Sequence, residues 1–276
     1  MAAENTPKDL EARYARARDA IDRAKRDLHE AHNLLSGIAG EVTNARARGA
    51  INQKIWDCER FAGHRNIFFS QAGQDAFLDE KVFRGKRNGT FVEIGGFDGI
   101  TGSNCLFFEL MRGWNGVIIE PSPTYHAKCA AFRKSPCLQV AVGDTRRNAE
   151  FLEITGGMRQ MSGLVHSYNA DLRERVEADP RHQGEVIKVE VRSLAQILDA
   201  HDLRQIDYIS LDVEGAEMSV LRDFPFEAYQ ITAFTIENND ANREVPALMA
   251  ANGYKRVEAI GVDDVYVLDP RESDGR

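Results

Sequence analysis

Apolar residues in the first 45 positions recur at alternating intervals of four and three residues. The series is Leu10, Tyr14, Ala17, Ile21, Ala24, Leu28, Ala31, Leu35, Ile38 and Val42. Such an interval, sustained over more than four heptads, predicts a helix with one apolar seam of the kind that packs in a coiled coil. We therefore expect residues 1–45 to form a helical arm that joins copies of the chain into a homo-oligomer. The alternative is a helix that folds onto its own chain.

The pattern changes after this arm. Residues 46–66 are predicted to be a linker or a second helix, and residues 67–276 a single domain. Within that domain, short apolar runs alternate with longer connections, which predicts an α/β fold, an open sheet with helices on both faces. The predicted strands of that sheet are Phe91–Ile94, Val117–Ile119, Leu138–Val142, Ile206–Leu211 and Ile231–Ile236. Further strands are expected at Glu150–Ile154 and Glu185–Val191, and helices at Ala76–Val82 and Leu194–His201.

Each of the five sheet strands is followed by a glycine turn, an acid or an amide. Gly95-Gly96 follows the first, Glu120 the second, Gly143-Asp144 the third, Asp212 the fourth and Glu237-Asn238 the fifth. Ligands of open α/β sheets bind at the carboxyl ends of the strands, so these groups predict one binding site.

The spacing of the glycines after the first strand limits which class of ligand the site can bind. Gly95, Gly96, Gly99 and Gly102 do not follow the G-x-G-x-x-G spacing of dinucleotide sites, which disfavours NAD and leaves a nucleoside. A carboxylate at the tip of the second strand, Glu120, is placed to accept hydrogen bonds from both ribose hydroxyls. Asp144 is the matching acceptor for an adenine amino group.

Several motifs along the domain resemble the ordered set of the FkbM-type methyltransferases. They are SQAGQD (70–75), FVEIGGFDG (91–99), SN (103–104), GWNGVIIEPSP (113–123), LDVEGAE (211–217) and IEN (236–238). The resemblance covers about residues 67–268 and implies a Rossmann-like class I fold that binds S-adenosylmethionine (SAM). It also implies O-methylation of a hydroxyl on a sugar, glycan or glycosylated natural product. The chain departs from the family in GGFDG, where GAxxG is more frequent, and in Ser210, where lysine is frequent.

The resemblance also implies which residues contact the cofactor. These are Gln71, Asp75, Glu93, Gly95, Gly96, Asp98, Ser103, Asn104, Glu120, Pro121, Asp144 and Asp212. Gln71 and Asp75 are expected to fold over the cofactor pocket. A purely structural alternative is that Ser70 or Asp75 caps the helix that follows.

Two groups of residues are candidates for the chemistry. His166 lies in the irregular segment Thr155–Asp171, the expected acceptor loop, where it is a candidate general base, although a lone loop histidine is often incidental. Asp212, Glu237 and Asn238 resemble the metal triad of divalent-dependent catechol methyltransferases, and their oxygen atoms suit Mg²⁺. In the alternative without a metal, Asp212 contacts the cofactor or the acceptor directly.

Composition limits the partners. The chain has 276 residues and a net charge of −8, and residues 66–276 carry −10 of it against +2 for residues 1–65. An acidic domain suits a cationic sulfonium cofactor and gives no attraction to nucleic acid. With no run of 18 apolar residues, no apolar leader and four unpaired cysteines, a cytoplasmic protein without a membrane span is expected. A second function stays open, that of a catalytically silent SAM-fold scaffold assembled through the arm.

Overall fold

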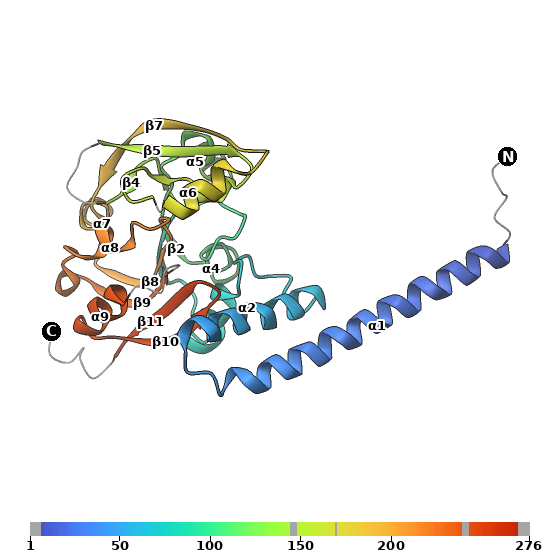
Figure 1. Ribbon diagram of the computed structural model, residues 1–276. Coiled ribbons are helices and arrows are strands. Elements are labelled where there is room, and N and C mark those ends of the chain that lie inside the picture. Colours follow the sequence, from blue (N-terminus) through green and yellow to red (C-terminus); the bar gives the residue numbers. More distant parts are fainter. Residues whose placement is uncertain (1–6, 144–147, 169, 239–242, 270–276) are drawn as a thin grey trace.

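A seven-stranded sheet forms the centre of the molecule (Figure 1). The structure is a computed structural model, and it describes residues 7–143, 148–168, 170–238 and 243–269. Its strand order is β10-β11-β9-β8-β1-β2-β3. The parallel part comprises β3 (Cys137–Leu138), β2 (Asn115–Ile119), β1 (Thr90–Ile94), β8 (Gln205–Leu211) and β9 (Gln230–Glu237). The hairpin of β10 (Tyr254–Ile260) and β11 (Asp263–Leu268) adds two strands, with β11 antiparallel to β9. The predicted α/β fold is therefore confirmed, whereas the hairpin was not predicted.

Apolar cores lie on both faces of this sheet, because alternate side chains of a strand point to opposite sides. Val92 faces a core closed by α7 (Leu194–Ala200), α8 (Glu217–Leu221) and α9 (Glu244–Ala251). Phe91 faces the other core, which includes α4 (Leu106–Arg112), α5 (Pro123–Phe132) and α3 (Gln74–Phe77). The predicted helix Ala76–Val82 begins two residues earlier, and its second half, Leu78–Val82, is a π-helical turn. A 3₁₀ turn, Phe226–Ala228, leads into β9.

A second sheet corrects the prediction for the third apolar run. Leu138–Val142 is not one strand: β3 ends at Leu138, and β4 (Ala141–Val142) pairs with β7 (Gln183–Arg192). The smaller sheet has the order β4-β7-β5-β6 and includes β5 (Asn148–Gly156) and β6 (Gly163–Leu164). A 3₁₀ turn, Arg159–Met161, precedes β6, and α6 (Ala170–Glu177) follows it. Asp144, the predicted adenine acceptor, lies outside the described residues.

The N-terminal segment forms two antiparallel helices, of which α1 (Pro7–Ala39) projects from the body (Figure 1) and α2 (Ala45–Phe61) lies against it. The seam residues Leu28, Ala31 and Leu35 are all half-buried, and α1 contacts α2. Leu10, Tyr14 and Ile21, nearer the start, are more than half exposed. The predicted helical arm is thus present, and one part of its seam packs on its own chain.

Helix α2 packs on β10, with Gly49 at the closest point. The Gly261 amide donates to the Gly49 carbonyl at 3.0 Å, and a Cβ on Gly49 would lie 2.4 Å from the Gly261 oxygen. Residues 46–66, predicted as a linker or helix, are therefore largely a helix fixed to the sheet. Within the described ranges, no helix is both long and apolar enough to cross a bilayer, and all four cysteines are free thiols.

Candidate active site

A cavity of about 950 Å³ opens at the carboxyl ends of the parallel strands. Residues that follow β1, β2, β8 and β9 form its floor, as the sequence predicted for the first, second, fourth and fifth apolar runs. Its walls include residues of α2, of the turn before α3, of the second sheet with α6, and of the turn between β10 and β11. Such a space is large enough for a nucleoside cofactor together with part of a second molecule.

The glycine turn after β1 approaches the end of β8 very closely. Gly95 has a φ of 93°, and a Cβ there would lie 2.2 Å from the backbone oxygen of Asp212. The amides of Gly95 and Gly96 both donate to the Ile119 carbonyl at 3.0 Å. Only glycine combines this left-handed backbone with so short a contact, so the two strand ends form one continuous floor.

Glu120, after β2, holds this turn in place. Its carboxylate accepts hydrogen bonds from the amides of Phe97 and Ser122, each at 2.8 Å. The side chain is almost completely buried, and this burial raises its pKa to about 8. The acceptor predicted for the ribose thus lines the cavity and also ties the first strand end to the second.

Most of the predicted cofactor residues line the cavity. They are Gln71, Gly95, Gly96, Ser103, Asn104, Glu120, Pro121 and Asp212. Asn104 donates from Nδ2 to the Ser210 hydroxyl at 3.0 Å, while its buried Oδ1 has no partner among the described residues. Gln71 is held beside the glycine turn because Ser70 pairs with Gly102 in an isolated parallel bridge. A ligand with a hydrogen-bond donor at this wall would supply the partner that the buried Oδ1 lacks.

Three predicted cofactor residues lie outside the lining, and each has another partner. Asp75 accepts from the amides of Phe69 and Ala76, at 2.7 and 2.9 Å, and so holds the turn before α3, whose N-cap, Gly73, has no side-chain cap. Glu93 accepts from Ser103 Oγ at 2.6 Å and from the buried Arg133 at 2.7 Å. Asp98 accepts from the Thr101 amide at 2.7 Å and so shapes the glycine turn. The structure therefore gives these acids supporting positions beneath the site.

His166, the predicted loop base, also lies outside the cavity lining. Met161, before β6, and the β6 residues Gly163 and Leu164 line the cavity, whereas His166, in the turn after β6, is exposed. The structure does not place this histidine at the strand ends, so its role as the base stays a prediction. The lining of this wall also includes Met158 and the polar side chains of Gln160 and Ser162.

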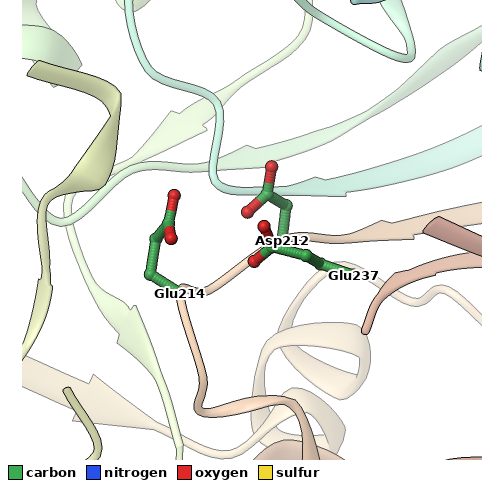
Figure 2. A group of neighbouring side chains, drawn as sticks. All are labelled: Asp212, Glu214 and Glu237. Atoms are coloured by element: carbon green, nitrogen blue, oxygen red, sulfur yellow. The ribbon is translucent and has the colours of Figure 1, made fainter. Parts of the chain in front are cut away.

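Carboxyl groups gather on the floor at the ends of β8 and β9 (Figure 2). Ligand oxygens of Asp212, Glu214 and Glu237 all lie within 4.8 Å of one another. Burial raises the pKa of Asp212, and it raises those of Glu214 and Glu237 further, with the charge of Asp212 adding to both. Asn238, predicted as the third metal ligand, also lines the cavity, but its Nδ2 donates to Asp264 at 3.0 Å.

Several lining residues were not predicted from the sequence. Asp263 opens β11 and accepts from Gln74 Nε2 at 2.9 Å, and Glu217 accepts from the amides of Val213 and Gly215. Helix α2 contributes Arg46, Gln53 and Lys54. The acids in LDVEGAE were visible as a motif, but nothing in the pattern of α2 signals that it faces a cavity.

The buried acids predict how stability depends on pH. Burial raises the pKa of Glu120 to about 8, and those of Glu217 and Asp263 to about 7, from ordinary values near 4. The folded chain then keeps protons that the unfolded chain has lost. The contribution of these three acids to the free energy of unfolding is therefore fully present below about pH 4 and is lost as the pH rises to 8. For each acid, a folded-state pKa that lies one pH unit above the unfolded value corresponds to about 1.4 kcal/mol.

Urea unfolding of the chelator-treated protein at pH 5.5, 7 and 8 measures this loss. In Glu120→Gln, whose side chain cannot ionise, the free energy of unfolding is expected to change less between pH 5.5 and pH 8 than in the wild type. A free energy of unfolding that rises from pH 5.5 to 8 contradicts the prediction.

Comparison with known proteins identifies the family. The family model described as Methyltransferase FkbM domain matches residues 93–256, more than half of the chain. No curated protein matches the sequence. Among solved structures, methyltransferase FkbM from Methylobacillus flagellatus KT is 11% identical with a TM-score of 0.44, over 86% of this chain and 58% of that one. The chain thus spans less than two thirds of the length of that structure.

Two other solved structures are similar at lower scores. A TehB-like SAM-dependent methyltransferase from Corynebacterium glutamicum is 10% identical with a TM-score of 0.38, over 77% of this chain and 96% of that one. The CurJ carbon methyltransferase is 9% identical with a TM-score of 0.32, over 87% and 69%. These overall likenesses are low, so the assignment rests on the family model. On that match, the chain belongs to the FkbM methyltransferase domain family.

Proposed function

We propose that the protein is a SAM-dependent O-methyltransferase whose acceptor is a hydroxyl of a sugar, glycan or glycosylated natural product. The observation that carries the proposal is a single cavity in which the glycine turn, Glu120 and the acids after β8 and β9 meet. The glycine turn and Glu120 suit the adenosine part of SAM, the first by close backbone approach and the second by accepting from ribose hydroxyls. The remaining space, toward the second sheet and α2, suits the acceptor.

The proposed reaction is a direct displacement. The acceptor oxygen forms a bond to the methyl carbon as the bond from that carbon to the sulfonium sulfur breaks, and S-adenosylhomocysteine leaves. The hydroxyl proton goes to a carboxylate, for which Asp212 is the candidate because it lines the cavity and burial raises its pKa. A raised pKa makes the carboxylate a stronger base, and the walls align the two reactants.

The test has two readings on the purified full chain. Calorimetric titration with SAM is expected to show one site, and incubation with methyl-labelled SAM and glycans from the producing cells is expected to label a sugar hydroxyl. If SAM binds and no acceptor is labelled, the chain is the silent SAM-fold scaffold. If SAM does not bind, both proposals fail. Labelled carbon in place of oxygen would retain methyl transfer and overturn the O-methyl assignment.

We also propose that α1 joins copies of the chain in the cytoplasm. The proposal is supported by the heptad seam, whose first residues Leu10, Tyr14 and Ile21 are more than half exposed. Apolar side chains at heptad spacing are buried when a second helix packs along them. Four free cysteines fit a reducing compartment.

Removal of residues 1–26 is expected to lower the mass of the particle in solution without unfolding the domain. The cut falls before Leu28, where α1 begins to pack on α2, so the helix pair and the cavity wall stay intact. Light scattering measures the mass. Tyr14→Asp with Ile21→Asp is expected to act like the truncation, whereas Arg16→Asp with Arg23→Asp, off the seam, is not. Equal masses for all these proteins would mean that the arm does not associate.

A further inference from the structure

The floor of the cavity contains three acids whose oxygens converge from different parts of the chain. Asp212 follows β8, Glu237 ends β9, and Glu214 comes from the loop between β8 and α8 (Figure 2). All three ligand oxygens lie within 4.8 Å of one another, and Glu214 and Glu237 are buried. Carboxylates this close repel one another unless a proton or a cation lies between them.

Glu214 gives the independent sign of a ligand. It is only 6% exposed, and its Oε2 has no hydrogen-bond partner among the described residues. Its backbone has a φ of 52°, a left-handed conformation that a glutamate seldom adopts. The loop therefore holds Glu214 in an unusual conformation, and the carboxyl group it places on the cavity floor is incompletely satisfied.

We propose that Asp212, Glu214 and Glu237 bind one hard divalent cation. Neighbouring oxygens around one Mg²⁺ lie about 3 Å apart and opposite ones about 4.2 Å apart, so oxygens that lie within 4.8 Å of one another close around the ion by movements of about 2 Å or less. Three carboxylate oxygens also leave coordination positions open for water or a substrate oxygen. Glu214 takes the place predicted for Asn238, whose amide nitrogen is bound to Asp264.

The position of this cation on the cavity floor gives it a role in the proposed reaction. A cation there binds the acceptor hydroxyl, lowers its pKa and orients its oxygen toward the methyl group. Because the ion also lowers the pKa of Asp212, the more acidic hydroxyl replaces the base strength that burial gives Asp212 without the ion. This role rests on the proposed function, whereas binding of the ion does not. The ligand set consequently selects acceptors that offer an oxygen, and vicinal hydroxyls above all, because two of them fill two positions on one ion.

The test uses Mn²⁺ as the probe, with the full chain freed of metal by a chelator and then dialysed. Loss of the free Mn²⁺ signal in electron paramagnetic resonance measures binding, and we expect one ion per chain, displaced by Mg²⁺ or Ca²⁺. Glu214→Gln keeps the shape of the side chain and removes its charge, and it is expected to weaken Mn²⁺ binding at least tenfold. Asn238→Ala is the matched control and is expected to leave Mn²⁺ binding within about twofold.

The results for the two variants test which side chains bind the ion. Weakening by Asn238→Ala and not by Glu214→Gln overturns the ligand set in favour of the one predicted from the sequence. No Mn²⁺ bound at millimolar concentration overturns the site and means that protons neutralise the acids. Circular dichroism and SAM titration of the same samples show that Glu214→Gln is folded. They also separate the two proposals. A protein that binds SAM and no Mn²⁺ supports the proposed methyl transfer and not the ion site, whereas a protein that binds Mn²⁺ and no SAM supports only the ion site.

Discussion

Arg133→Met is expected to destabilise the protein by about 3–5 kcal/mol, the usual cost of removing one partner from a buried ion pair. The Arg133 side chain is fully buried, and it donates to Glu93 at 2.7 Å and to Glu109 at 2.5 Å. Its Nη1 also donates to the Gly99 carbonyl and Ser103 Oγ, each at 3.2 Å. Without the guanidinium, two carboxyl groups stay buried with no cation beside them, and the glycine turn loses its support from below.

Urea unfolding at pH 7 measures this loss. Arg192→Met is the matched control, because its ion pair with Glu190 is about half exposed, and we expect no measurable change there. A triple variant, Arg133→Met with Glu93→Gln and Glu109→Gln, removes all the buried charge together and is expected to regain part of the lost stability. If Arg133→Met unfolds at the wild-type urea concentration, the cluster does not stabilise the turn.

Glu120→Ala is expected to weaken SAM binding about 10- to 150-fold. The physical reason is the loss of an acceptor for ribose hydroxyls. At pH 9, where a carboxyl group with a pKa of about 8 is ionised, a hydrogen bond to this charged group contributes about 1.5–3 kcal/mol. Part of the effect is expected to come from the turn itself, because the same carboxylate holds the amides of Phe97 and Ser122. Calorimetric titration with SAM measures the affinity.

A second variant separates the loss of the ribose acceptor from the loosening of the turn. Glu120→Gln retains one acceptor oxygen and loses the charge, so its affinity for SAM is expected to lie between those of the wild type and Glu120→Ala. Unfolding midpoints of both variants show how far the turn has loosened. An unchanged SAM affinity in Glu120→Ala would remove Glu120 from the cofactor site.

The parallel core of the fold was predictable because its evidence is local. Runs such as Val117–Ile119 are apolar throughout, as expected of strands buried on both faces, and each ends in a polar group or a glycine turn. The second sheet was missed as a sheet because β5 and β7 pair across 26 intervening residues, and such pairing leaves no mark in either strand. The third apolar run was misjudged for a related reason, since its two ends pair with strands of different sheets.

The candidate site was predictable where it lies directly after a strand. Glu120 and Asp212 line the cavity as expected, because the first residue beyond a parallel strand is placed at the sheet edge. Glu93 is not in the lining, because it lies inside the strand and pairs with Arg133. The contribution of Glu214 depends on a left-handed backbone that no residue pattern signals, and Asp263 opens its strand where the other acids follow theirs.

Helix α2 has a consequence for where the part of the chain that encloses the cavity begins. Similarity to the family starts at residue 93, and the sequence motifs start near residue 70. Arg46, Gln53 and Lys54 nevertheless line the cavity, and Gly49 rests on the backbone of Gly261. A boundary drawn by homology therefore removes one wall of the cavity, and the shortest piece that keeps this wall begins at Ala45. The same helix packs against α1, so a piece that keeps this wall of the cavity also keeps the surface on which α1 rests.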